Sequence, residues 1–468
     1  MATPSQTEAT DAEGTSVTVG AVIDSLPVGR FQRRLLIVVG GIWASVALSI
    51  LIISFTIPIH EAVWELSAVE VGVLGSATLF GMMFGTSLGG RYSDRNGRKR
   101  ALVVSVGIFT ACTALTGLAT GFVSAVAFRF LTGIGVGAAV TVAAAYLSEH
   151  VPTRWRGRYL AYLEGFFALG NLLTVLLAAA TLPAGSTDAT VFGVAAWRVT
   201  FFAAGAPILF VGLIHTQLSE SPYYLARTGQ LSAASDRLTA IAAENGSHTD
   251  VSPEQLQSGE GVQPSFGRLL QPDLLGRTLL ISVVWAGLNL GYYGVFIWLP
   301  DTIQAAGYVG GLYVYLTTVG VFQLLGVLTA STVVDRLGRR RVLAASFVLA
   351  GLSTALFVLA LPGVNVGLGL DGTPALLAGL FATGFSLFGA FAVIFGYTTE
   401  LFPTAVRSSG LGFASGLGKI AAVVGPILAG SLVSFGYAVA LAPFAVVLLA
   451  TGLLLGFFGP ETVGETLE

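Results

Sequence analysis

Three ionisable side chains lie inside the long apolar stretches of this 468-residue sequence, namely Arg129, Glu164 and Lys419. A charge in apolar surroundings is costly, so such residues face a cavity, an ion path or a partner. A carboxyl group removed from water favours its neutral form and can therefore carry a proton. A buried cation can hold an anion or pair with an acid. These residue types predict proton transfer and the binding of a small charged molecule.

Each of the three residues also has a structural interpretation. Arg129 could bond to carbonyl groups of neighbouring helices, and Glu164 could be a permanent partner of Arg129 or of another group on the fourth predicted helix. Lys419 could pair with an acid or act as the counter-charge of an anionic substrate. Cations in both halves of the chain favour an anion over a cation as the bound molecule. The glycines near Arg129 and Lys419 lack the context of nucleotide-binding loops.

Uncharged polar residues add to this candidate site. Asn289, Tyr292 and Tyr293 lie in one apolar stretch, where a tyrosine could stack on a planar substrate. Gln323 and Asn171 are amides within other apolar stretches, and they could bond to substrate or to neighbouring helices.

A short basic string occurs twice, 241 residues apart, at 90–100 and at 331–341. Each copy contains Asp-Arg-x-Gly-Arg between two apolar stretches. We expect the acid of each copy to accept bonds from a nearby arginine and from a helix N-terminus of the opposite half. Such a cluster would form when that side of the protein is closed and break when it opens. The loop residues predicted to act in gating are Gly90, Asp94, Arg95, Gly97, Arg98, Asp335, Arg336, Gly338 and Arg339.

A second repeat supports an internal duplication. Residues 146–156 align without a gap on residues 397–407 and share the order Tyr, Glu, Pro-Thr and Arg. Parallel repeats of this kind are typical of transporters that bind their substrate between two halves near the middle of the bilayer. The acid and the last arginine of each copy join the predicted gating residues: Glu149, Arg156, Glu400 and Arg407.

Composition places both halves in a membrane. Hydrophobic residues make up 54% of the chain, charged residues 10%, and the mean hydropathy is +0.81, which leaves too few charges to surround a soluble core. The single cysteine, Cys112, excludes an intramolecular disulfide and a cysteine-based metal site. Twelve stretches reach the roughly 20 residues that a membrane helix needs. They lie near 35–59, 67–89, 101–120, 122–147, 159–181, 197–217, 277–300, 310–333, 342–361, 374–398, 409–431 and 437–458.

The basic residues predict the orientation. Twenty of the 23 lysines and arginines fall on one side of the twelve-span arrangement, while acids dominate the opposite loops. Because positive charge marks the cytoplasmic side, both termini and the central segment are expected in the cytoplasm. The predicted units are an N-terminal tail, disordered at its start (1–34), a six-helix bundle (35–217), a central loop (218–276), a second bundle (277–458) and a C-terminal tail (459–468).

On these motifs the chain resembles the major facilitator superfamily over nearly its whole length. The two Asp-Arg-x-Gly-Arg loops resemble its signature between helices 2 and 3 and between helices 8 and 9, and residues 129–137 resemble its helix-4 motif. Pro-Thr-Arg-Trp-Arg-Gly at 152–157, Glu-Ser-Pro at 220–222 and Pro-Glu-Thr at 460–462 resemble motifs of its sugar-porter-like branches. Residues 26–32, 163–170, 292–300 and 400–407 resemble the metabolite:proton symporters, the niacin- and aromatic-acid-transporter-like group.

The resemblance implies an all-α integral membrane protein whose twelve helices form two pseudo-symmetric six-helix bundles, working as a monomer in the plasma membrane. It implies no enzyme but a secondary transporter that moves an organic or aromatic carboxylate with a proton by alternating access. Its partners would be the substrate, protons and lipid bilayer, with no nucleic acid, cofactor or metal ion. It also implies a role for Arg129 near the substrate or in coupling. The predicted substrate and proton-coupling residues are thus Arg129, Glu164, Lys419, Asn289, Tyr292, Tyr293 and Gln323.

Helix 1 departs from the symporter group, which usually carries acids there. The matching stretch, 43–49, has none. Glu164 is then the main candidate proton carrier, and an uncoupled facilitator is an alternative. The Glu-Ser-Pro and Pro-Glu-Thr strings favour a further alternative, a sugar or polyol porter, although a neutral sugar requires neither Arg129 nor Lys419. The short central loop argues against a sensor, and the lack of a phosphate-binding loop excludes an ATP-driven pump.

Overall fold

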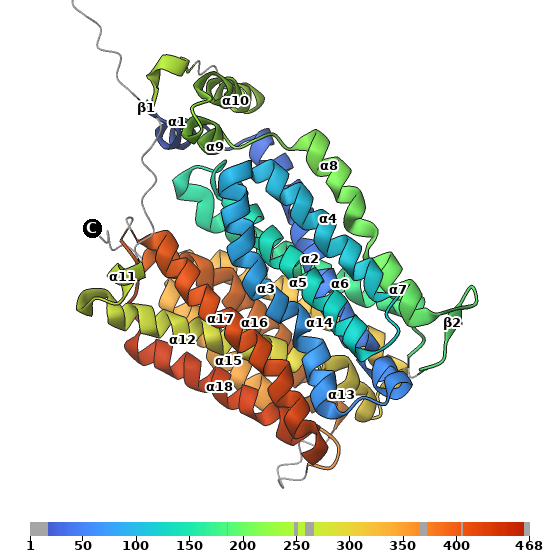
Figure 1. Ribbon diagram of the computed structural model, residues 1–468. Helices are drawn as coiled ribbons and strands as arrows, with labels where there is room; N and C mark the ends of the chain where they lie inside the picture. Colours follow the sequence, from blue (N-terminus) through green and yellow to red (C-terminus); the bar gives the residue numbers. More distant parts are fainter. Residues whose placement is uncertain are drawn as a thin grey trace, which may run out of the picture.

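The computed structural model describes residues 17–184, 186–247, 251–257, 266–364, 372–403 and 406–462. Within them, twelve helical segments are long and apolar enough to cross a membrane, which confirms the predicted fold class. Figure 1 shows them as two bundles, the first coloured blue to green and the second yellow to red.

The first bundle contains α2 (Arg30–Trp64), α3 (Ala68–Asn96), α4 (Arg98–Thr116), α5 (Phe122–Ser148), α6 (Thr153–Thr181) and a broken sixth span made of α7 (Ala196–Ala204), η1 (Ala206–Leu209) and α8 (Phe210–Gln217). The second contains α12 (Pro272–Phe296), α14 (Leu312–Leu337), α15 (Arg339–Leu359), α16 (Thr373–Glu400), α17 (Arg407–Leu432) and α18 (Tyr437–Phe458). Short elements join them: β2 (Thr190–Val191), β3 (Val194–Ala195), α11 (Phe266–Leu269), α13 (Leu299–Ala305), η3 (Val309–Gly311) and η4 (Val433–Phe435).

The two ends of this assembly differ in charge. We call the end with the two repeated loops the basic end. The opposite end, which carries Glu61 and Asp301, is the acidic end.

Glycine explains the sharp turn inside each repeated loop. Gly97 separates α3 from α4 with a φ of 93°, and Gly338 separates α14 from α15 with a φ of 95°. A side chain would strain the backbone there. The Asp-Arg-x-Gly-Arg pattern therefore places its acid on the helix that ends and its last arginine on the helix that begins.

Small residues let α3 and α5 touch backbone to backbone. A Cβ atom added to Gly81 would lie 2.1 Å from the carbonyl oxygen of Phe130, and one added to Gly133 would lie 2.0 Å from that of Thr78. Such contacts replace the missing hydrophobic drive between membrane helices with close packing. The prediction that the glycines after Arg129 serve helix packing is confirmed. The halves meet where α3 packs on α17, and where α6 packs on α14 and α16.

A small domain covers the basic end of the first bundle. It consists of β1 (Val17–Thr18), α1 (Val19–Ser25), α9 (Pro222–Arg227), α10 (Leu231–Glu244), η2 (Pro253–Gln255) and β4 (Leu256–Gln257). Its own apolar core includes Ile23, Leu225 and Leu238. Figure 1 shows these elements together at one end of the molecule.

Two side chains fasten this domain to the bundle. Asp24 accepts from the backbone N–H of Thr153 at the start of α6 (2.6 Å), and Asn245 accepts from that of Phe31 at the start of α2 (3.1 Å). The predicted N-terminal tail is thus folded from residue 17 onward, and the described part of the central loop contains helices and a strand. Residues 1–16, where the disordered start was predicted, lie outside the described residues.

Candidate functional site

Asn171 links the two bundles. It lies on α6, and its Nδ2 donates to Oη of Tyr292 on α12 (3.0 Å) and to Oε1 of Gln323 on α14 (2.9 Å). All three side chains are buried. The sequence left open whether Asn171 and Gln323 bond to helices or to substrate, and here they bond to one another across the bundles. Two of the predicted site residues, Tyr292 and Gln323, are thereby brought together.

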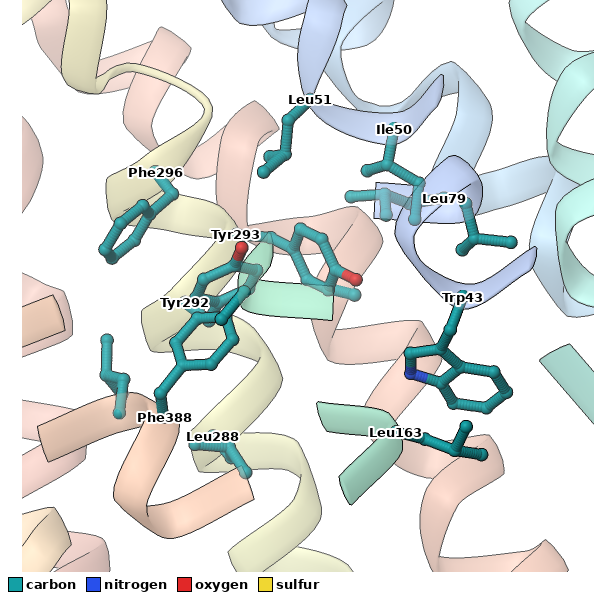
Figure 2. Close-up of a cluster of buried hydrophobic side chains, with 14 of the residues drawn as sticks. Trp43, Ile50, Leu51, Leu79, Leu163, Leu288, Tyr292, Tyr293, Phe296 and Phe388 are labelled. Carbon is teal, nitrogen blue, oxygen red and sulfur yellow. The ribbon is translucent and has the colours of Figure 1, made fainter. Parts of the chain in front are cut away.

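Tyr292 belongs to an aromatic wall, shown in Figure 2. Its ring centroid lies 4.8 Å from that of Phe296, 4.9 Å from Tyr293, 5.4 Å from Phe391 and 5.7 Å from Phe388. The wall belongs to the second bundle, and it presents flat apolar surfaces of the kind on which a planar molecule can pack.

A cavity between the bundles adjoins this wall. Its lining is mostly apolar with a few polar groups, which is the usual composition of a small-molecule site. The first bundle contributes Ser54, Phe55 and Asn171, and the second contributes Phe296, Leu316 and Gln323, among others.

Glu164 and Lys419 approach each other from opposite bundles. Glu164 lies on α6 and is 6% exposed, whereas Lys419 lies on α17 and is half-buried. They form no direct ion pair in the described part of the chain, but each carries its charge close enough to act on the other. The indole of Trp43 on α2 and the phenol of Tyr293 also lie near the Glu164 carboxyl. The structure thus brings two predicted charged residues to one place.

Asn289 borders this charged pair without joining the hydrogen bonds of Asn171. Its Nδ2 donates to the carbonyl oxygen of Trp285 in its own helix (2.9 Å). A Cβ atom added to Gly418, next to Lys419, would lie 2.9 Å from the same nitrogen. Asn289 therefore packs α12 against the segment of α17 that holds the lysine.

Arg129 lies elsewhere, inside the first bundle. It is fully buried, and its Nη2 donates to the carbonyl oxygens of Ser49 (2.6 Å) and Ile50 (3.1 Å) on α2. Its guanidinium lies over the ring of Phe201 at 5.9 Å. Its Nε and Nη1 find no partner in the described residues. These contacts match the structural interpretation of Arg129, and no described contact joins it to Glu164.

The first repeated loop is a network centred on Arg98. This arginine contacts Asp94 at 2.6 Å and Glu149 at 2.9 Å. Glu220 accepts from the backbone N–H of Arg98 (2.7 Å) and so caps α4, where the helix dipole favours a negative charge. Tyr146 donates to the carbonyl oxygen of Ser219 beside it (2.6 Å).

The second loop repeats this arrangement. Arg339 contacts Glu400 at 2.6 Å and Asp335 at 3.7 Å. Glu461 accepts from the backbone N–H of Arg340 (3.3 Å), and Tyr397 donates to the carbonyl oxygen of Pro460 (2.8 Å). The predicted grouping of acids and arginines is therefore present in both halves.

The sequence reasoning missed the capping acids, Glu220 and Glu461, as members of the candidate site. Both stand in the Glu-Ser-Pro and Pro-Glu-Thr strings that resemble sugar-porter motifs. The two acids are separated by 241 residues, which is also the spacing of the two loops. This equal spacing could have indicated that each acid belongs to the loop of its own half.

The partners of the loop acids across the bundles differ from the prediction. Asp94 contacts Arg98 of its own bundle and Arg227 of the small domain (3.7 Å), whereas Asp335 reaches Arg158 of the other bundle at 3.3 Å. A contact of either acid with a helix N-terminus of the opposite half does not occur among the described residues. Thr404 and Ala405, just before α17, lie outside them.

The remaining predicted gating residues have smaller parts. Arg156 donates to the carbonyl oxygen of Val151 (3.1 Å) and holds the turn between α5 and α6. The backbone of Arg95 accepts a hydrogen bond from Tyr224 of α9 (3.0 Å). Nε of Arg407 is buried without a partner in the described chain. For Gly90 and Arg336 the described residues show no contact that assigns a role.

The acidic end joins the bundles more extensively than the basic end does. Tyr313 on α14 donates to the carbonyl oxygen of Leu182 after α6, and Ser76 on α3 donates to that of Val423 on α17 (2.8 Å). A Cβ atom on Gly72 would lie 2.9 Å from the carbonyl oxygen of Pro426. The bundles are thus closed together at the acidic end in this conformation.

Comparison with known proteins agrees with this architecture. A family model described as "Sugar (and other) transporter" matches residues 39–468. The niacin transporter NiaP of Acinetobacter baylyi is 31% identical over 449 residues, which cover 95% of this chain and 98% of that protein. The organic cation/carnitine transporter 7 of Arabidopsis thaliana is 26% identical, with 97% and 96% covered. The inward open structure of the xylose transporter XylE from E. coli matches with a TM-score of 0.73 at 21% identity, covering 93% of this chain and 98% of that one.

Two six-helix bundles with a polar site between them and a repeated loop in each define a transporter of the major facilitator superfamily. Within it, the chain belongs to the sugar (and other) transporter family, whose model spans nearly all of it. It is a membrane transporter of small metabolites.

Proposed function

We propose that this protein is a proton-coupled symporter of a small organic carboxylate, with an aromatic carboxylate as its best substrate. The observation that carries the proposal is the approach of Glu164 and Lys419 from opposite bundles beside the aromatic wall. A carboxyl group and an ammonium group in one enclosed site suit a proton and an anion that travel together.

The proposed binding mode follows from the positions of these groups. The substrate ring packs on the wall of Tyr292 and Tyr293, and its carboxylate faces Lys419. Glu164 carries the proton. A proton that moves with a monovalent anion makes the cycle electroneutral, so that the pH gradient drives it. The relative NiaP, which matches this chain over nearly its whole length, is named for niacin, which is an aromatic carboxylate.

Alternating access would depend on how firmly the two bundles are joined at the acidic end and at the basic end. The excess of basic residues at the basic end supports its assignment to the cytoplasm of a plasma-membrane protein. In that orientation this conformation is closed on the outer side, and an exposed ion pair between Arg158 and Asp335 bridges the bundles on the inner side. Rocking of the bundles around Glu164 and Lys419 would expose the site to either side in turn.

Uptake into proteoliposomes under an imposed pH gradient tests this function. Glu164→Gln is expected to abolish uphill accumulation of an aromatic carboxylate while leaving counterflow exchange, because exchange needs no net proton movement. Glu65→Gln, an exposed acid at the acidic end, is the matched control and should accumulate substrate normally. Unchanged pH-driven accumulation in Glu164→Gln would rule out coupling through this residue.

A sugar or polyol porter is the second candidate, favoured by the match to the sugar transporter model. A neutral sugar has no charge for Lys419 to balance. Screening carboxylates, sugars and organic cations in the same vesicles separates the candidates. Lys419→Gln should abolish carboxylate transport, whereas a sugar porter would keep most of its activity in that variant.

A further inference from the structure

Helix α2 contributes a polar group to the site although it carries no acid there. The indole of Trp43 is 4% exposed, and its N–H has no hydrogen-bond partner of normal geometry among the described residues. Buried donors are almost always paired, so an unpaired one at the edge of a functional site calls for an explanation. The second tryptophan near the site, Trp285, is paired in the usual way, since its N–H donates to Oγ1 of Thr398 at 3.0 Å.

Close packing of α2 on α6 fixes the place of this indole. A Cβ atom on Gly40 would lie 2.5 Å from the ring of Phe166, and one on Gly170 would lie 2.2 Å from the carbonyl oxygen of Ala44. These two contacts lie on either side of Trp43 and lock the register of the helices. In the view of Figure 2, the nitrogen edge of the indole is turned toward Tyr292 and Tyr293, and Leu163 of α6 lies below the ring.

The carboxyl group of Glu164, the next residue after Leu163, lies near this indole but forms no hydrogen bond with it among the described residues. Glu164 therefore has an unpaired donor nearby in its own bundle, Trp43, and a cation nearby in the other bundle, Lys419. The other titratable groups near Glu164 are the phenols of Tyr292 and Tyr293 on α12. A carboxylate in this position depends on one donor and one cation for its stability.

A substrate carboxylate would need the same two groups. We propose that Trp43 is a positioning residue whose N–H donates to Glu164 in one state and to the carboxylate of the substrate in the other. This switch of acceptor couples anion binding to protonation of Glu164. The inference rests on the proposed symport function. When Glu164 is ionised, the indole N–H of Trp43 and the ammonium group of Lys419, which both lie near it, turn to its carboxylate. When the substrate anion binds, it accepts the N–H of Trp43 and pairs with Lys419. The carboxylate of Glu164 then has neither partner and binds one proton from water on the open side.

Release reverses these steps. When the anion leaves, Glu164 loses its proton to water on the other side and regains the indole N–H and the charge of Lys419. One anion and one proton cross the membrane, and no covalent bond changes. The mechanism gives α2 a part in coupling without an acidic residue, and it requires a substrate with a negatively charged acceptor group.

Trp43→Phe tests the inference, since it keeps an aromatic ring and removes the N–H. We expect the pH at which uptake is half-maximal to move to higher values, because ionised Glu164 loses its donor. Uphill accumulation at a fixed pH gradient should fall about tenfold, as the anion loses a charge-assisted hydrogen bond. Trp285→Phe is the matched control, which should leave the pH dependence of uptake in place.

Three outcomes separate the possibilities. An unmoved pH profile with normal accumulation in Trp43→Phe overturns the inference, and the proposed symport then stands if Glu164→Gln still abolishes accumulation. Normal accumulation in Glu164→Gln overturns the proposed function itself. Trp43→His restores a ring N–H in a smaller side chain and should recover part of the accumulation that Trp43→Phe loses. If His and Phe variants change equally, Trp43 acts through packing alone and the inference fails.

Discussion

The two repeated loops share their sequence and their hydrogen bonds but differ in what surrounds them. In the first loop the side chains of Arg98 and Glu149 are 13% and 16% exposed, and the small domain lies over them. In the second loop Arg339 and Glu400 are 24% and 34% exposed. Only the second loop reaches the other bundle in the described chain, through Asp335.

This difference separates two tasks that the duplicated sequence does not distinguish. The first loop binds its own bundle and the small domain, so it makes that half rigid. The second loop is held less tightly and touches the opposite bundle, so it is the one whose contacts change when the halves rock. A common motif thus supports a fixed part and a moving part.

The largest expected effect comes from removing the central arginine of each loop. Arg98→Gln leaves the poorly exposed Glu149 without its cation, which should lower the free energy of unfolding by about 3 kcal/mol. Arg339→Gln acts on better-solvated acids and should cost about 1–2 kcal/mol. Thermal unfolding of the two variants in detergent measures the difference. Equal losses would mean that the small domain adds nothing to the first loop.

The capping acids should follow the same order with smaller effects. Glu220 accepts from the backbone N–H of Arg98 at 2.7 Å, whereas Glu461 accepts from the backbone N–H of Arg340 at 3.3 Å. Glu220→Gln is expected to cost about 1 kcal/mol and Glu461→Gln about half of that. Chemical unfolding in mild detergent provides the measurement. A larger loss for Glu461→Gln would reverse the assignment of the rigid half.

A pH dependence should be confined to the first loop. Burial lowers the pKa of His150, next to Glu149, below its ordinary value. Below about pH 6.5 the unfolded chain binds a proton at His150 that the folded chain does not bind. The free energy of unfolding is therefore highest above about pH 6.5 and falls as the pH drops. Leu401 stands at the matching position of the second half. We expect wild-type protein to lose a few degrees of thermal stability from pH 7 to pH 5, and His150→Leu to lose less. An identical pH dependence in both would contradict this assignment.

The smallest effect on stability is expected at the contact between the bundles. The side chains of Arg158 and Asp335 are 46% and 54% exposed, so their pair should contribute less than about 1 kcal/mol. Asp335→Asn should therefore leave the melting temperature nearly unchanged and alter the transport rate. A double-mutant cycle with Arg158→Gln measures the coupling. Coupling as large as that between Arg98 and Glu149 would show that the second loop is also fixed.

The sequence predicted the fold well because bilayer thickness sets the length and polarity of the spans. Twelve spans, two halves and the glycine-mediated packing after Arg129 followed from that constraint. The small domain was missed, since β1, α1, α9 and β4 are short and partly polar and acquire an apolar face only when they meet.

The candidate site was predicted in its residue types and only partly in its arrangement. Glu164 and Lys419 stand out as charges in apolar stretches, but 255 residues separate them and no local pattern indicates that they approach each other. Arg129 has the same signature and lies in another place, because an internal charge can also be satisfied by carbonyl groups of a neighbouring helix. Trp43 was not among the predicted site residues, since hydropathy does not report an unpaired N–H.

The pairing of β1 with β4 has a consequence for how the chain is made. Val17 pairs with Leu256, so the N-terminal strand has no partner until more than half of the protein has been synthesised. Closing so long a loop is slow and comes late in folding. The small domain can therefore assemble only after all six spans of the first bundle have left the ribosome. Its formation would mark the point during biogenesis at which that bundle is complete.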